Sequence, residues 1–181
     1  MSEILWHIGN AETGTNPENA SNHWQHFNVN GHNVLDLGCG RWYTTDFNEF
    51  TPIYFKNMGA KKIIGIDLSP EEIDFFSRIT HDDTDFIFIC KKISSAKDIK
   101  DLLNEYSITA IKCDIEEDEK YLLELTKDDM RNVTEFALEF HSIELRDLSI
   151  KKCREWGFTI NLYSDLGSEG NAVAVIYCRK E

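Results

Sequence analysis

The sequence predicts an α/β fold: a seven-stranded, mostly parallel sheet with helices on both faces and a C-terminal antiparallel hairpin. Short apolar runs alternate with helix-like stretches from residue 33 to about residue 157, which is typical of parallel strands joined by crossover helices. Beyond that point two apolar runs flank a glycine-rich turn, which indicates a hairpin. We find no linker, so we expect one domain over 33–181, preceded by a less regular segment over 1–32.

Apolar runs of strand length predict the sheet. The first run, over 33–37, contains the apolar residues Val34, Leu35 and Leu37, as expected of a buried parallel strand, and it opens into a Gly-x-Gly turn. The lack of a Cβ in such a turn lets a ligand approach the backbone closely. The remaining strands are expected over 62–67, 85–90, 109–115, 134–141, 158–163 and 172–178.

Capping residues indicate where the helices begin and end. Ser69, followed by Pro70 and two glutamates, is typical of a helix start, because the hydroxyl accepts a free backbone N–H and acids favour that end of the helix dipole. Gly59 and Gly157 are typical of helix ends. Helices are expected over 16–27, 51–58, 95–106, 118–125 and 145–156, and another is expected to begin at residue 70.

Charge and cysteine content limit the partners and the surroundings. With a net charge of −13, the chain would repel a polyphosphate over most of its surface, so we expect no nucleic-acid partner. The five cysteines are scattered without metal-binding spacing, which favours reduced thiols and a cytoplasmic location. We see no targeting pattern and no apolar run of membrane-spanning length, so we expect no membrane partner.

The segment over 1–32 is rich in Asn, His, Gly and Trp. We expect Trp24 and Phe27 to pack on the domain and His23 and His26 to face water. One alternative is that the segment forms a lid over a substrate. Another is that the two histidines bind a metal, for which no third ligand is close in sequence.

The run over 36–40, Asp-Leu-Gly-Cys-Gly, resembles motif I of the class I methyltransferases, which bind S-adenosyl-L-methionine (SAM) and have a Rossmann-like fold. Trp42 stands where that motif has its third glycine. The resemblance implies SAM as the cofactor. NAD fits less well, because its fingerprint requires a further glycine at the position of Tyr43.

Asp67 is the second element of the expected cofactor site. It ends the second strand, where an acid can accept hydrogen bonds from the ribose hydroxyls of an adenosine ligand. The alternative is that Asp67 caps the next helix, a role for which Ser69 competes. The residues expected to bind the cofactor are Asp36, Gly38, Cys39, Gly40, Asp67, Leu68 and Asp114.

The run over 111–119 resembles the signature of FkbM-type methyltransferases, Leu-Lys-Ile-Asp-Val-Glu-Gly-x-Glu, with Glu117 in place of the glycine. The Glu-x-His at 139–141 resembles a later strand of that family, and the resemblance covers about residues 33 to 160. It implies an O-methyltransferase that acts on the hydroxyl of a small molecule. The departures at Trp42 and Glu117 favour an alternative, a non-catalytic SAM-binding or interaction module with a methyltransferase fold.

Methyl transfer to a hydroxyl requires that its proton leave, so a general base or a metal ion is expected. Glu139 and His141 share one face of their strand, and they would meet Asp114 if the two strands are neighbours. We therefore expect these three side chains to be catalytic, with His141 as the base because its ordinary pKa is near neutrality. The alternative is a divalent ion held by Asp114 and Glu139.

Lys112 lies inside an apolar strand, so its ammonium group requires a buried partner. We predict an ion pair with Glu139, and this pair, with the cofactor's demand on Asp114, disfavours a metal ion at the site. The acidic run over 116–119 is expected to be a solvated helix start. Candidates for substrate contacts are Arg41, Trp42 and Tyr43, and the alternative is a surface loop that its aromatic residues anchor.

Overall fold

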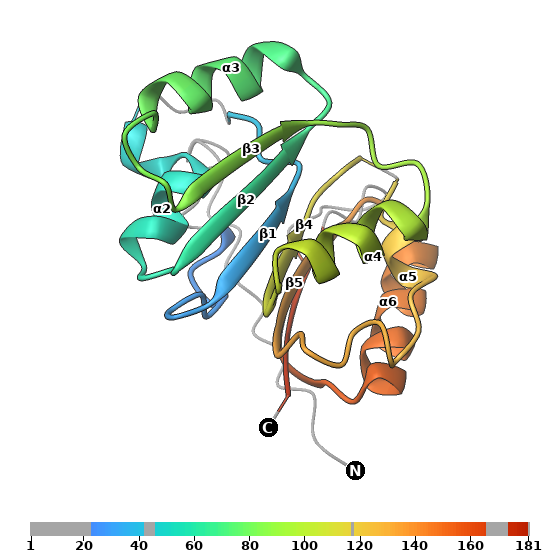
Figure 1. The fold of residues 1–181 in the computed structure, drawn as a ribbon. Helices are drawn as coiled ribbons and strands as arrows, with labels where there is room; N and C mark the ends of the chain where they lie inside the picture. Colours follow the sequence, from blue (N-terminus) through green and yellow to red (C-terminus); the bar gives the residue numbers. More distant parts are fainter. Residues whose placement is uncertain (1–22, 42–45, 117, 166–173, 181) are drawn as a thin grey trace.

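The computed structural model describes residues 23–41, 46–116, 118–165 and 174–180, the last four residues of β6 and the first of β7 by their backbone alone. Its centre is a seven-stranded sheet in the order β3-β2-β1-β4-β5-β7-β6 (Figure 1). β1 to β5 run parallel, and β7 runs antiparallel to both β5 and β6. The strands are β1 Asn33–Leu37, β2 Lys62–Asp67, β3 Phe86–Cys90, β4 Ala110–Cys113, β5 Glu135–Phe140, β6 Thr159–Asp165 and β7 Ala174–Arg179. The predicted fold class is confirmed.

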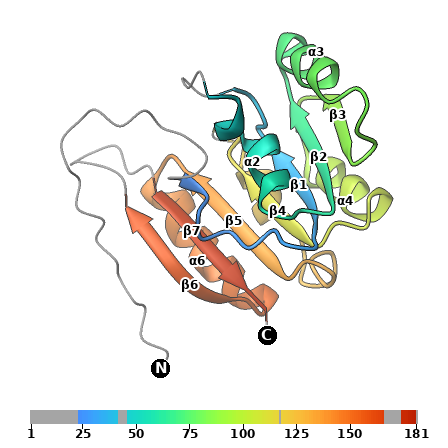
Figure 2. The same cartoon turned by 90° about the vertical axis from the view of Figure 1, so that its left-hand side faces the viewer.

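Helices cover both faces of the sheet. α2 and α3 lie on one side, and α4, α5 and α6 lie on the other (Figure 1). Figure 2 shows the β6–β7 hairpin at the edge of the sheet farthest from α3. The bounds are α2 Thr51–Asn57, α3 Pro70–Ile79, α4 Ala96–Glu105, α5 Lys120–Leu123 and α6 Ile143–Trp156, with a short 3-10 helix η1 Phe47–Glu49 before α2.

Alternate residues of the strands supply two separate cores. Leu35 and Leu37 of β1 face the core that packs under α4, α5 and α6. Val34, the residue before Leu35, faces the opposite core, which contains Phe55 of α2 and the N-terminal aromatic residue Trp24. Because successive strand side chains point to opposite faces, a continuous apolar run fills both cores at once.

The described part of the N-terminal segment, residues 23–32, packs against the second core. Trp24 and Phe27 are buried, as predicted. His26 is exposed, but the prediction that His23 faces water is wrong, because that side chain is 7% exposed and bonded to Glu139. Most of the helix predicted over 16–27, and of the segment considered as a lid, lies outside the described residues.

The helix ends at Ser69 and Gly157 follow the predicted capping chemistry, whereas α2, which begins at Thr51, has no side-chain cap at its start. The Ser69 hydroxyl accepts the N–H of Glu72 at the start of α3, and Gly157 ends α6 in the left-handed conformation with φ 89°. α5 is shorter than the predicted 118–125. The backbone carbonyl of Leu125 accepts the indole N–H of Trp156 at 2.9 Å instead of continuing the helix.

The N-terminus of α4 provides a test of the folding energetics. One oxygen of Asp98 accepts bonds from the Ser94 and Ser95 hydroxyls and from the Ser94 N–H, while the other lies 2.8 Å from Nζ of Lys91. The bond with Lys91 is the main reason why the pKa of Asp98 is held well below its ordinary value. Asp98→Asn should therefore lower the free energy of unfolding by about 1 kcal/mol at neutral pH, as measured by urea denaturation.

The pH dependence of that difference checks its cause. A carboxylate whose pKa is depressed by folding stabilises the protein above its unfolded pKa, and this stability is lost as the pH falls. The gap between wild type and Asp98→Asn should therefore narrow below about pH 4. A gap that stays constant down to pH 3 would show that the charge of Asp98 is not responsible.

The structure describes the state of every cysteine and the length of the helices. All five cysteines are free, and Cys39, Cys113, Cys153 and Cys178 are buried whereas Cys90 is exposed. Reduced core thiols were predicted, and four of the five sites agree. Among the described helices, none combines the length and apolar character needed to cross a membrane.

Candidate functional site

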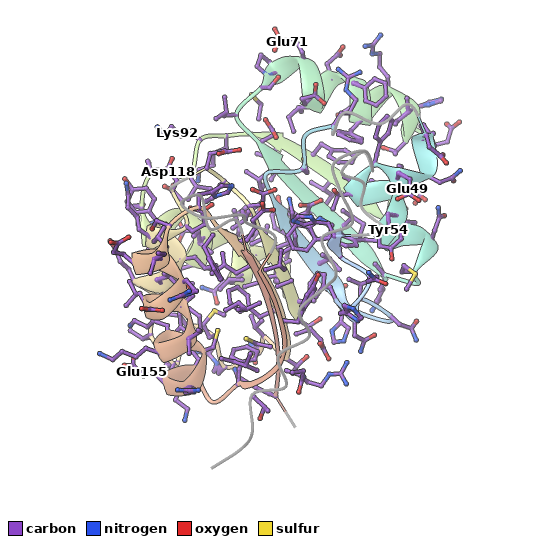
Figure 3. All side chains as sticks on the ribbon, turned by 180° about the vertical axis from the view of Figure 1, so that it is seen from behind. Glu49, Tyr54, Glu71, Lys92, Asp118 and Glu155 are labelled. Atoms are coloured by element: carbon purple, nitrogen blue, oxygen red, sulfur yellow. The ribbon has the colours of Figure 1, made fainter. Side chains whose placement is uncertain are left out.

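A cavity of about 550 Å³ opens where the parallel strands end. This is the place where ligands bind in open α/β sheets, beside the point at which the strand order reverses between β1 and β4. Lys92 and Asp118, labelled in Figure 3, lie at its rim with 3.7 Å between Nζ and Oδ2. The cavity is lined by Gly38, Gly40, Arg41, Ile66, Asp67, Leu68, Lys91, Lys92, Ile93, Asp114, Ile115, Glu116, Asp118, Glu139 and His141.

The two glycines of the Gly-x-Gly turn after β1 are needed for different reasons. Gly38 has φ 76°, and a Cβ there would lie 1.7 Å from the backbone oxygen of Asp114, so the turn packs directly against the chain after β4. A Cβ on Gly40 would lie 3.0 Å from Oδ2 of Asp67 and would crowd that oxygen at the cavity wall. The first glycine is required by the fold, and the second keeps the Asp67 carboxylate accessible.

Asp67 combines the two roles that the sequence left open. Its Oδ1 accepts the backbone N–H of Ser69 at 2.8 Å and so helps to start α3, while Oδ2 is the oxygen beside Gly40. Ser69 is the N-cap residue itself. Leu68 also lines the cavity and is 70% exposed.

Two of the predicted cofactor residues lie beneath the cavity rather than in its wall. Asp36 and Cys39 are fully buried, and neither lines the cavity. Asp36 lies directly opposite Lys112 in the register of β1 and β4, and the Nζ of Lys112 is 3.0 Å from Oδ1 of Asp36. Asp36 is thus placed to act on the site through Lys112.

Lys112 is fully buried, as predicted, but its predicted partner Glu139 is wrong. Besides Asp36, its ammonium group donates to the backbone oxygens of Leu37 at 3.2 Å and Gly38 at 2.6 Å. These bonds tie the Gly-x-Gly turn to β4. Burial alone would lower the pKa of Lys112, but the charges of Asp36 and Asp114 outweigh it and raise the pKa above its ordinary value.

The structure brings the three predicted catalytic side chains together. β4 and β5 are neighbours, and Cys113 is opposite Leu138, so Asp114, directly after β4, and Glu139, one residue before the end of β5, come next on the two strands. Nε2 of His141 lies 3.9 Å from Oδ1 of Asp114 and 3.8 Å from Oε1 of Glu139. All three residues line the cavity.

Two further residues support this group, and sequence analysis did not assign them to it. Glu119 is fully buried, so the prediction of a solvated acidic run is wrong there; its Oε1 accepts the Ile115 N–H at 3.2 Å and lies 3.3 Å from Nδ1 of His141. Glu116, by contrast, is exposed, with φ 50°. In the sequence, the sign that Glu119 belongs to the site was its match to the last position of the FkbM signature.

His23 is the second supporting residue, and it bonds Oε2 of Glu139 at 2.7 Å. The backbone oxygen of His23 accepts the Tyr177 hydroxyl.

The surroundings of Asp114, Glu139 and His141 shift the pKa values of all three side chains. The Glu119 carboxylate beside the imidazole raises the pKa of His141 to about 9. Burial raises the pKa of Asp114 to about 7. Burial opposes the charge of Glu139 too, but the bond with His23 holds the pKa of that carboxyl below its ordinary value. His141 is therefore protonated at neutral pH in the free protein, whereas the predicted base role depends on a near-neutral pKa.

Arg41 is held by α3 and also lines the cavity. Its Nε and Nη2 donate to the carboxylate of Glu72, both at 2.8 Å, and its guanidinium lies 4.2 Å from the centre of the Phe75 ring. This arrangement fixes the start of the loop to α3, and the position of Arg41 in the cavity wall leaves it available for a substrate contact. Trp42 and Tyr43 lie outside the described residues.

Comparison with known proteins adds information on the fold. No family model matches the chain, and no curated protein matches its sequence. Among solved structures, fibrillarin from Aeropyrum pernix with natively bound SAM has a TM-score of 0.55 at 13% identity, over 88% of this chain and 72% of that one. An rRNA methylase from Streptococcus thermophilus has a TM-score of 0.57 at 15% identity, over 86% and 90%.

Magnesium protoporphyrin IX methyltransferase from Synechocystis, solved with bound SAM, has a TM-score of 0.52 at 13% identity, over 85% of this chain and 72% of that one. These proteins act on different kinds of substrate, so what they share with this chain is the architecture. The chain has the fold of the class I SAM-dependent methyltransferases.

Proposed function

We propose that the protein is a SAM-dependent methyltransferase that methylates a hydroxyl group of a small molecule. The observation that carries this proposal is one cavity, at the strand ends, in which an accessible Asp67 carboxylate and the Asp114, Glu139 and His141 group both lie. The similarity to two structures solved with bound SAM supports the same cofactor here.

The residues present fit SAM. Gly40 leaves Oδ2 of Asp67 accessible for the ribose hydroxyls, and Oδ1 retains lone pairs beyond its bond to Ser69. The turn at Gly38, held by Lys112, offers backbone close to the cavity. Asp114 supplies negative charge for a cationic ligand. When bound, SAM would supply a methyl group on a positively charged sulfur, and transfer then depends on holding the acceptor close and in line.

The cavity favours a small acceptor over a nucleic acid. Its volume of about 550 Å³ is typical of a small-molecule site. The two lysines at its rim are both paired with carboxylates, Lys91 with Asp98 at 2.8 Å and Lys92 with Asp118 at 3.7 Å. With a net charge of −13, the chain would also repel a polyphosphate over most of its surface, which disfavours RNA as the acceptor. Asp114, Glu139 and His141 would receive the acceptor hydroxyl.

Isothermal titration calorimetry with SAM tests the proposal. We expect saturable binding of one SAM per chain, and formation of S-adenosylhomocysteine when a library of small hydroxyl compounds is added. Absence of SAM binding to the folded protein would overturn the proposal. Binding without turnover on any hydroxyl compound would instead favour the alternative, a non-catalytic SAM-binding module.

A further inference from the structure

The inward-facing atoms of Asp114, Glu139 and His141 lie at a distance that hydrogen bonding does not explain. Nε2 of His141 is 3.9 Å from Oδ1 of Asp114 and 3.8 Å from Oε1 of Glu139, and one ligand atom from each residue lies within 4.8 Å of the others. Hydrogen bonds between nitrogen and oxygen are about 2.7–3.2 Å long. Ligand atoms bound at about 2.0–2.2 Å to a shared metal ion lie roughly 3–4 Å apart, so a small contraction would enclose an ion.

The outward-facing atoms of the same side chains are held by other residues. Nδ1 of His141 faces the buried Glu119 carboxylate at 3.3 Å, and Oε2 of Glu139 bonds His23 at 2.7 Å. Glu119 is itself fixed by the Ile115 N–H. A carboxylate on the far nitrogen of a histidine fixes the ring so that the near nitrogen faces a metal, which is the usual support of a metal-bound histidine.

The position of Lys112 removes one of the two predicted grounds against a metal ion. That ground was an ion pair between Lys112 and Glu139; the other was the demand of the cofactor on Asp114. The ammonium group instead bonds Asp36 and two backbone oxygens, with Asp114 no closer than 3.9 Å. Both carboxylates therefore keep an oxygen for a ligand in the cavity.

We propose that Asp114, Glu139 and His141 bind a divalent transition-metal ion. One imidazole nitrogen and two carboxylate oxygens suit ions such as Mn²⁺, whereas Mg²⁺ and Ca²⁺ prefer oxygen alone. Three protein ligands leave coordination positions open toward the cavity. The role of the ion rests on the proposed function: there it would bind the acceptor hydroxyl and lower its pKa. The binding itself does not depend on that function.

Titration of the metal-free protein with Mn²⁺, without SAM, tests the proposal by calorimetry and by the EPR signal of free Mn²⁺. The titrations are done in a Cys90→Ser background, because Cys90 is an exposed thiol. We expect one Mn²⁺ per chain. Asp114→Asn and His141→Phe should each abolish saturable binding, and Glu119→Gln should weaken it 10- to 100-fold through the orientation of His141.

A surface histidine provides the matched control. His81 lies 3.0 Å from Asp82, and both side chains are exposed, so His81→Phe should leave Mn²⁺ binding unchanged. Lack of saturable binding to the wild type, or equal binding by Asp114→Asn, would overturn the proposal, and thermal denaturation checks that each variant is folded. SAM binding without Mn²⁺ binding would overturn the metal site alone, whereas Mn²⁺ binding without SAM binding would overturn the proposed function alone.

Discussion

Replacing Lys112 with methionine is expected to lower the free energy of unfolding by about 3–5 kcal/mol. Methionine has a similar length but no charge, so the fully buried Asp36 would lose the ammonium group 3.0 Å away. Burial already raises the pKa of Asp36, and Lys112 opposes that effect. The backbone oxygens of Leu37 and Gly38 would lose their donor too. Urea denaturation followed by circular dichroism measures the loss.

Two variants separate the buried ion pair from a general effect of removing a lysine. Lys97→Met removes a lysine from the surface of α4, where Lys97 pairs with Asp101, and should leave the stability unchanged. Lys112→Met combined with Asp36→Leu removes both buried charges and should regain much of the lost stability. The ion pair would not be the cause if Lys112→Met alone were within about 1 kcal/mol of the wild type, or if the double variant were no more stable than the single one.

The partner of Lys112 shows where sequence information stops. The burial of Lys112 could be predicted, because the residue stands inside an apolar strand. Its partner could not, because β4 has two neighbours, β1 and β5. The prediction used β5, whereas the register places Lys112 opposite Asp36 of β1. Asp36, the motif acid predicted to bind the cofactor, is instead placed to hold Lys112, which in turn holds the Gly-x-Gly turn of the site.

The part of the site that lies at the ends of adjacent parallel strands could be predicted from the sequence. Asp114, Glu139 and His141 converge because strand length and periodicity place them at one edge of the sheet. The partners of that group come from elsewhere: Glu119 from the turn before α5, and His23 from 116 residues before Glu139. A contact over that separation depends on how the N-terminal segment packs, and local patterns carry no information on it.

Asp67→Asn is expected to weaken SAM binding about 10- to 150-fold, which is about 1.5–3 kcal/mol for a hydrogen bond to a charged group. Asparagine keeps an oxygen that can accept the Ser69 N–H, so the start of α3 should be preserved. What is lost is the charge, and one acceptor oxygen becomes an NH₂ group that cannot accept from a ribose hydroxyl. Calorimetric titration of both proteins with SAM measures the difference.

The matched control is Glu71→Gln, which makes the same change of charge on α3 close to Asp67. Glu71, labelled in Figure 3, accepts a bond from the Ser69 hydroxyl and does not line the cavity. Its substitution should leave SAM affinity within about twofold of the wild type, because an exposed charge outside the cavity is screened by solvent. Equal affinity of Asp67→Asn and wild type would exclude ribose binding by Asp67. Equal weakening by both substitutions would assign the effect to the net charge near α3, because only a direct contact with the ribose distinguishes the two carboxylates.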